Sequence, residues 1–250
     1  MYEFASNEEE SLFYAESALE DKLMHNEMCN LFDMYDIAYL EEGESATDST
    51  KVKGVGGKLV DGILRIIEKI RKAVTGIIEG FKSAFTSDKK RLTAEEYMAA
   101  DSTQEKLMYD INAMVEQVDE EYRLARPLIG GISSITKMDT KTVEELCDKL
   151  DGVVGKGYAK ARNLAVKGYE NKGKIAKSGA VKILANKLIS NSEAIKKSDE
   201  EYNKHMIAMK ARKLNDIDFQ NMKKIDRVLM SVNRLVQKWD RVGRKVSKFL

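Results

Sequence analysis

The side chains that most often carry catalysis are few and scattered in this chain. Its two histidines, His25 and His205, lie far apart and outside any HExxH pattern, so they do not form a zinc or Ser/His site. The glycine–lysine pairs that begin at Gly57, Gly155 and Gly173 are not followed by Ser or Thr, which excludes a P-loop. No GxGxxG motif occurs, and no pair of acidic residues is flanked by apolar sequence that would raise a pKa. We therefore predict a protein without catalytic residues, cofactor or metal site, and thus not an enzyme.

The two cysteines, Cys29 and Cys147, form no CxxC pattern, and each stands among apolar residues with helical spacing. This placement is typical of buried free thiols in a reducing compartment. The amino-terminal residues are acidic, whereas a secretory signal begins with basic ones, and no run of about 18 apolar residues could span a membrane. We expect the protein to be soluble and cytoplasmic when it is made.

The chemistry that the sequence does favour is binding to a polyanion. Residues 152–190 hold nine basic residues and one acidic residue, a net charge of +8. Such side chains can neutralise phosphates and release counterions without reading base sequence, and no helix-turn-helix, zinc finger or RNA-binding aromatic motif accompanies them. The alternative is a solvated basic face. The nine candidates are Lys156, Lys160, Arg162, Lys167, Lys172, Lys174, Lys177, Lys182 and Lys187.

A second candidate surface is the wide apolar stripe of residues 59–85. Its members recur at steps of three and four, with charged residues on the opposite face, which predicts an amphipathic helix. Such a face binds an anionic membrane surface in interfacial helices, and it packs inside a helical bundle in ordinary globular proteins. Both interpretations use the same residues: Val60, Ile63, Ile67, Ile70, Val74, Ile77 and Phe81.

The elements that position these residues are all expected to be helices. A single proline, Pro127, and an abundance of Lys, Glu, Ala, Leu, Ile and Met favour an all-α fold, either a helical bundle or elongated amphipathic helices joined by a flexible Gly/Ser-rich linker. The helix expected at 6–40 has one apolar face, which includes Leu19, Leu23, Met24 and Met28, and an acidic face opposite. Further helices are expected at 59–85, from Ser102 to just before Pro127, and at 142–150, 193–214 and 216–250.

Charge divides the chain into an acidic head and a basic body. Residues 1–42 hold 12 acidic residues and one basic residue, a net charge of −11, whereas residues 43–250 carry a net charge of +12. This asymmetry indicates a polyanion partner, an autoinhibitory or removable segment, or two oppositely charged helices that pack together. We expect four regions: the acidic helix 1–42, a flexible linker 43–58, an amphipathic helical region 59–150 and a basic helical region 151–250.

The junction of head and linker reads Leu40-Glu41-Glu42-Gly43. This resembles the site at which prohead proteases of large tailed bacteriophages cut, after a Glu that has Leu or Ile two residues before it and a small residue after it. The same spacing recurs at Ile77-Ile78-Glu79-Gly80, inside an expected helix, where a protease could not reach it without unfolding. The resemblance implies cleavage between Glu42 and Gly43.

The resemblance also implies a function. Internal head proteins of these phages carry a short amino-terminal targeting segment that is cut off in the prohead, and their basic body stays with the packaged DNA. We therefore expect a non-enzymatic structural protein of a virion, present in the host cytoplasm before assembly. Its expected partners are virion or capsid proteins, DNA bound without sequence specificity, and further copies of itself. The alternatives are a membrane-surface or membrane-remodelling protein and a helical adaptor that binds only protein.

Overall fold

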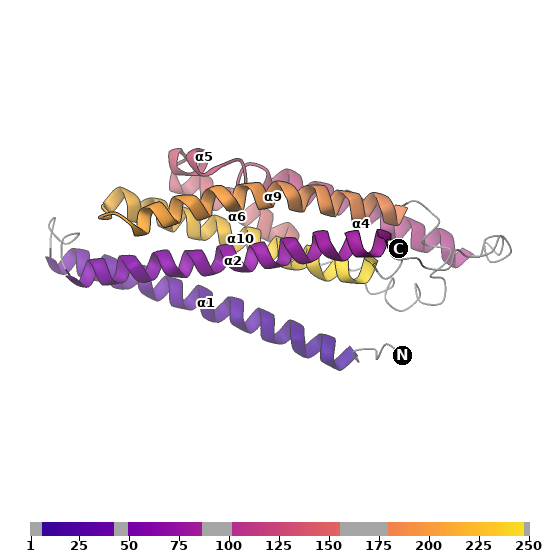
Figure 1. The fold of residues 1–250 in the computed structure, drawn as a ribbon, viewed down its shortest axis with the longest axis horizontal. Coiled ribbons are helices and arrows are strands. Elements are labelled where there is room, and N and C mark those ends of the chain that lie inside the picture. Colours follow the sequence, from indigo (N-terminus) through magenta and orange to yellow (C-terminus); the bar gives the residue numbers. More distant parts are fainter. Residues whose placement is uncertain (1–6, 43–49, 87–101, 156–179, 248–250) are drawn as a thin grey trace. The chain divides into compact units, whose positions relative to one another are not determined.

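The computed structural model describes residues 7–42, 50–86, 102–155 and 180–247, and these form seven helices and no strand (Figure 1). The expectation of an all-α fold is therefore confirmed. The helices are α1 (Asn7–Glu42), α2 (Thr50–Thr86), α4 (Ser102–Ala125), α5 (Ile132–Lys137), α6 (Thr140–Val154), α9 (Ala180–Lys210) and α10 (Asp216–Val246).

The chain divides into two compact units. Unit 1 comprises Met1–Arg65 and Met206–Lys223, and unit 2 comprises Ile66–His205 and Lys224–Leu250. Helices α2, α9 and α10 contribute residues to both units. The expected division near residue 150 is not the one that the structure has, because unit 2 combines helices from both sides of that position. The boundary near residue 150 was expected from a change in composition. The two units are instead defined by contacts between segments that are distant in sequence.

Unit 1 is built on the inward face of α1. Apolar side chains of α1 meet those of the first four turns of α2, the last turn of α9 and the first two turns of α10. Their burial supplies the main favourable term for this unit. The buried set is Met24, Met28, Leu31, Phe32 and Tyr35 of α1, Val55, Leu59, Val60 and Ile63 of α2, and Met206, Met209, Phe219 and Met222.

The turn between α9 and α10 is fixed by a reciprocal cap. The Asp218 backbone N–H donates to Oδ1 of Asn215, and the Asn215 backbone N–H donates to Oδ2 of Asp218, both at 3.0 Å. These bonds satisfy two amides at the start of α10, as a capping box does. Arg212 adds an ion pair to Asp218 at 2.5 Å. The cap therefore holds the residues between the two helices in one conformation.

Unit 2 buries one apolar stripe from each of its long helices. Its buried apolar side chains come from α2 (Ile67, Ile70, Val74, Ile77, Phe81), α4 (Ile111, Met114, Val118), α6 (Val143, Cys147, Leu150), α9 (Leu184, Leu188, Ile195, Tyr202) and α10 (Ile225, Val228, Leu229, Val232, Val236, Trp239). Helix α4 ends two residues before Pro127, as expected from the missing amide and the ring of proline. Gly131, at φ 114°, then opens α5 in a conformation that L side chains rarely adopt.

Polar contacts inside unit 2 join helices that are far apart in sequence. The fully buried Glu121 of α4 accepts from Lys238 Nζ at 2.6 Å and from Trp239 Nε1 at 2.8 Å. Lys224 Nζ donates to the carbonyls of Thr136 and Met138 at 2.8 and 3.0 Å, which satisfies acceptors at the end of α5. A buried charge of this kind is tolerated because its partner is within hydrogen-bond distance.

Three expectations about individual elements need correction. Residues 50–58 belong to α2 and are not a flexible linker, because Val55 and Gly56 are buried against the rest of unit 1; residues 43–49 lie outside the described part. Helix α6 begins at Thr140 with Asp139 as its cap, two residues before the expected start. Helix α9 begins at Ala180 and not at residue 193.

The face of α1 also differs from the expectation. Met24 and Met28 are buried, whereas Leu19 and Leu23 are exposed. The expected single apolar face is therefore two faces, since Met24 directly follows Leu23 and so lies about 100° further round the helix.

Candidate functional site

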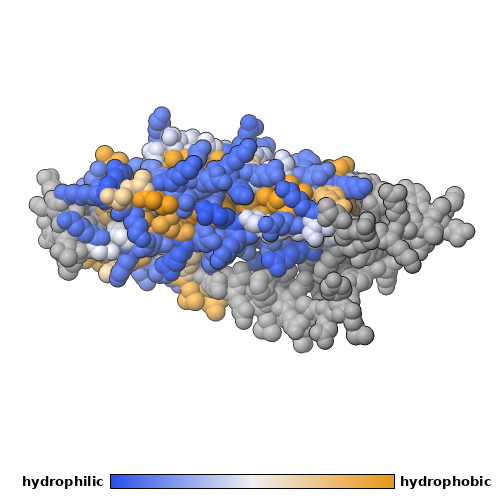
Figure 2. Space-filling model, in the orientation of Figure 1, coloured by the Kyte–Doolittle hydropathy of each residue, from blue (hydrophilic) through white to orange (hydrophobic). Residues whose placement is uncertain are grey.

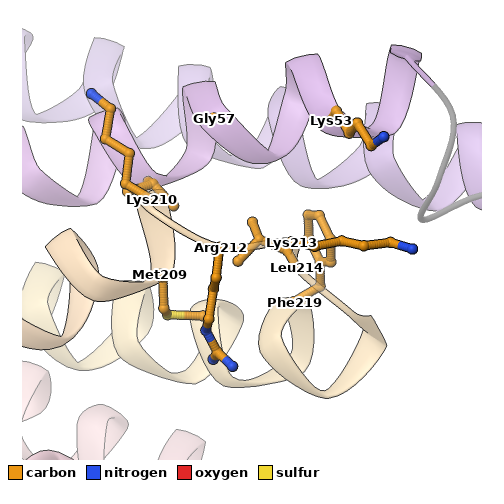
Figure 3. Close-up of a pocket in the computed structure, with 9 residues that line it drawn as sticks. Lys53, Gly57, Met209, Lys210, Arg212, Lys213, Leu214 and Phe219 are labelled. Atoms are coloured by element: carbon orange, nitrogen blue, oxygen red, sulfur yellow. The ribbon is translucent and has the colours of Figure 1, made fainter.

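One cavity formed by described residues lies in unit 1 (Figure 3). It has a volume of about 340 Å³, which is within the usual range for ligand sites. Helix α2 forms one wall, and the end of α9, the turn and the start of α10 form the other. We call it the turn pocket. Its lining residues are Lys53, Gly57, Val60, Met209, Lys210, Arg212, Lys213, Leu214 and Phe219.

The turn pocket has an apolar lining and a cationic rim. Val60, Met209 and Phe219 are buried apolar residues, and four of the nine lining residues carry a positive charge. At least two of these charges are partly balanced within unit 1, because Lys210 pairs with Asp61 at 2.6 Å and Arg212 pairs with Asp218. Figure 3 shows the cationic groups pointing in different directions and not converging on one point. The arrangement therefore suits a ligand with an apolar group and several separated negative charges.

Glycines allow the close packing of α2 in this region. A Cβ on Gly56 would stand 3.0 Å from Leu214 Cδ1 and 3.1 Å from Phe219 Cζ, so residue 56 must remain small. A Cβ on Gly57 would meet nothing within 4 Å, because that side faces the turn pocket. A Cβ on Gly62 would meet Met28 Sδ of α1, so a larger residue at this position would force Met28 to move.

The acidic helix α1 is attached to unit 1 by aromatic and charged contacts. Tyr35 stacks on Phe219 with ring centroids 3.5 Å apart, and its hydroxyl donates to Asp216 at 2.9 Å. Lys223 pairs with Asp36 at 2.7 Å. Arg65 of α2 pairs with Glu27 at 2.8 Å, and both side chains are about half exposed. Exposed pairs of this kind contribute about 0–1 kcal/mol each, so the apolar face provides most of the attachment.

Glu42 is the last residue of α1. The bond between Glu42 and Gly43, which the resemblance marks for cleavage, therefore begins at a helix end; Gly43 itself lies outside the described residues. The competing match lies inside α2, where Ile77 and Ile78 are buried. Cutting there would require the helix to unfold.

The expected polyanion-binding residues are mostly outside the described part. Seven of them, from Lys156 to Lys177, fall within residues 156–179. Lys182 is exposed on α9, and Lys187 donates to Asp119 of α4 at 2.6 Å. Lys187 therefore already has an acidic partner within unit 2, and the described structure does not bring the nine together.

The candidate apolar face of α2 is core. Every one of its seven residues, Val60, Ile63, Ile67, Ile70, Val74, Ile77 and Phe81, is at most 2% exposed. This face was expected either to bind a membrane surface or to pack inside the protein, and in the structure it is packed inside the protein. No described helix is both long enough and apolar enough to cross a bilayer.

The cysteines and histidines form no reactive cluster in the described residues. Cys147 is buried and lies 3.7 Å from the carbonyl of Arg227, and burial raises the pKa of its thiol to about 11, so it stays protonated. Cys29 is exposed, contrary to expectation, and its Sγ lies 3.7 Å from His25 Nε2, one helical turn away. No three His, Cys, Asp or Glu residues of the described part could share a metal ion.

Two buried carboxyls are the most strongly perturbed acids of unit 2. Burial raises the pKa of Asp226 to about 7 and that of Asp199 to about 6. Arg71 pairs with Asp199 at 3.3 Å and opposes the increase there. Each carboxyl has one oxygen without a hydrogen-bond partner in the described residues. Because they lie on helices packed in a core, they affect stability and do not form a site.

Sequence reasoning missed the turn pocket. Its walls come from residues about 150 positions apart, and no periodicity joins them. One local signal was available: the run Lys210-Ala211-Arg212-Lys213, followed by Asn215 and Asp218 at capping-box spacing, marks a basic turn between two helices. The chain matches no protein-family model, no curated protein and no solved structure.

Proposed function

We propose that this chain is a non-enzymatic structural protein in which α1 is a removable acidic cover, as in the internal head proteins of large tailed phages. The observation that supports it is the position of Glu42. The acidic helix ends at this residue, and the resemblance places the cut directly after it. Cleavage there would separate the whole of α1 and would cut none of the other described helices.

The contacts of α1 support a covering role. Glu27 and Asp36 are paired with Arg65 and Lys223, so loss of α1 would leave two more cationic side chains without these partners. It would also remove a net charge of −11 from the chain. The remaining body, at +12, would bind DNA through phosphate contacts and would contact capsid or other virion proteins. Its place would be the virion, after synthesis in the host cytoplasm.

A helical adaptor is the second candidate, and a specific observation favours it. Unit 1 exposes large apolar side chains that a monomer has no evident use for: Leu19, Leu23, Met34, Ile37, Ile207 and Ile217. No comparable observation favours a membrane-surface protein, because the face that would bind lipid is buried.

The mass of the protein from its natural source tests the proposal. We expect a processed chain that begins at Gly43, and a Glu42→Ala variant expressed in the same source should keep its full length. Full-length protein in assembled particles would contradict the removable cover and would favour the adaptor. A chain cut elsewhere, such as after Glu79, would contradict the assignment of the site.

A further inference from the structure

Helix α1 carries a second apolar stripe that faces away from its own core. Leu19, Leu23, Met34 and Ile37 are 57%, 59%, 51% and 56% exposed. Their spacings of four, eleven and three residues place them on one side of the helix, opposite Met28. We call these four residues the outer stripe. An exposed apolar row of this length is typical of an interaction surface.

The charge of α1 restricts which partner can cover the outer stripe. Residues 7–42 hold 11 acidic residues and one basic residue. Two such helices placed side by side would repel each other, so a symmetric pairing of α1 with α1 is unfavourable. The fitting partner is apolar at its centre and basic at its edge.

The turn pocket of the same chain has this character. Its apolar lining is surrounded by Lys53, Lys210, Arg212 and Lys213, and the cationic groups are spread apart, as a helix with acidic residues on successive turns requires (Figure 3). Ile207 and Ile217, 53% and 71% exposed, lie two residues along the chain from lining residues. Figure 2 shows a mainly hydrophilic face on which hydrophobic residues form separate small patches.

A nucleic acid is a poorer fit to the turn pocket. The ring of Phe219 is 1% exposed and stacks on Tyr35, so it offers no face on which a base could stack. The Arg212 guanidinium pairs with Asp218, and the lysine ammonium groups do not converge on one phosphate. A protein surface with apolar side chains flanked by carboxylates fits better, because the pocket has an apolar lining and a cationic rim.

We propose that the outer stripe of one copy docks on the turn pocket of a second copy. An apolar side chain of α1 enters the pocket, and acidic residues of α1 face its cationic rim. The two surfaces differ, so the contact is head to tail and can add further copies into a ring or an open chain. This inference does not depend on the proposed cleavage after Glu42. Such cleavage would remove the outer stripe, and the copies would then dissociate.

Two variants of the full chain test the contact. Gly57→Glu places a carboxylate in the pocket at a position where a Cβ meets nothing within 4 Å. The double variant Leu23→Glu, Ile37→Glu changes only exposed positions, so neither variant should lose the helical circular dichroism of the wild type. The matched controls are Gly80→Glu, also in α2 with open space around its Cβ, and Ile183→Glu, an exposed apolar position outside unit 1.

Sedimentation equilibrium of each protein gives the first readout. The wild type and both controls should increase in average mass with concentration above the 28.2 kDa of one chain, and high salt should weaken this association. Each of the two variants should associate at least tenfold more weakly. A wild type that stays at one chain at all concentrations would overturn the proposal, and so would variants that associate as the wild type does.

Mixing the two variants tests the head-to-tail geometry. The Gly57→Glu chain retains an intact outer stripe, and the Leu23→Glu, Ile37→Glu chain retains an intact pocket. An equimolar mixture should therefore form pairs with the mass of two chains and nothing larger. A mixture that remains monomeric, or that assembles beyond pairs, would show that these two surfaces do not meet in this way.

Discussion

At the scale of single residues, Asp226 is an acidic group buried in the described core of unit 2. Its side chain is buried on α10, and one carboxyl oxygen has no hydrogen-bond partner among the described residues. Burial raises the pKa of this carboxyl from an ordinary value of 3.8 to about 7, and Arg227 opposes the increase only in part. Unit 2 therefore retains a group that is more stable in its neutral form.

The pH dependence of stability follows from this shift. Between the unfolded pKa of 3.8 and the folded value of about 7, folded protein binds the proton that unfolded protein releases. The contribution of Asp226 to stability is therefore fully present below the lower value and is lost as pH increases through the higher one. Asp199, with a pKa raised to about 6, acts in the same direction.

Asp226→Asn should stabilise unit 2 at pH 8, since an amide carries no charge to bury. A shift of about three pKa units corresponds to roughly 4 kcal/mol, which is an upper bound on the gain. At pH 5 the gain should be much smaller, because the wild-type carboxyl is then protonated in the folded protein. The fluorescence of Trp239, the single tryptophan and a buried residue of unit 2, reports unfolding in urea at each pH.

The exposed Asp33→Asn is the control for this measurement, and it should leave the pH dependence unchanged. If Asp226→Asn destabilises unit 2 equally at pH 5 and pH 8, the carboxyl makes a contact that depends on its charge. The argument from burial would then be wrong.

At the scale of elements, two nearby glycines of α2 should respond oppositely to the same substitution. Gly54→Ala should stabilise the helix by about 0.5–1 kcal/mol, because a Cβ there meets nothing within 4 Å and alanine is the better helix former. Gly56→Ala should destabilise unit 1, because its Cβ would press on Leu214 and Phe219. Hydrogen exchange of the amides of residues 53–65 measures both effects. Equal protection in the two variants would mean that α2 does not pack against the turn as described.

The buried face of α2 gives a second prediction for an element. Ile70 is 1% exposed, so Ile70→Glu should bury an unpaired carboxylate and destabilise unit 2 by about 3 kcal/mol or more. Trp239 fluorescence in urea checks this, with the exposed Lys72→Glu as control. A variant that remains as stable as the wild type and loses binding to anionic vesicles would instead support the membrane-surface alternative.

How far each helix was predictable depends on the regularity of its apolar spacing. Steps of three and four in α2 and α10 identified their buried faces, from Val60 to Phe81 and from Met222 to Val246. In α1 the apolar series contains a step of one residue, from Leu23 to Met24, so two stripes on different sides of the helix were taken as one. The amino-terminal end of α2 was missed because its glycines and lysines are poor evidence for a helix, and its burial depends on Leu214 and Phe219, far away in sequence.

Buried polar groups and the turn pocket were beyond prediction for a related reason. Glu121 is one acidic residue among many on α4, and only its distance to Lys238 and Trp239 distinguishes it. The basic run at residues 210–213 was visible, but its wall on α2 was not. Local sequence predicts which side chains a helix offers, and the partner that covers them depends on the tertiary structure.

At the scale of the whole molecule, charge is the property that connects the two proposals. The acidic helix α1 nearly cancels the charge of the remaining chain, which leaves +1 overall. In the proposed assembly this helix also provides the acidic side of each contact between copies. Cleavage after Glu42 would therefore do two things together: it would separate the copies and leave a strongly basic body.

Binding to random-sequence duplex DNA should accordingly increase when the chain is cut after Glu42. We expect the processed protein to bind at least tenfold more tightly than the full chain at about 0.1 M salt, with a steeper decrease of affinity as salt increases, because more phosphate contacts release more counterions. Fluorescence anisotropy of labelled DNA across a salt series measures both quantities. The Glu42→Ala chain is the control, since it should bind as the uncut protein does. Equal affinity of the cut and uncut chains, or an affinity that does not change with salt, would show that α1 does not shield a DNA-binding body; the acidic helix would then serve contacts between proteins alone.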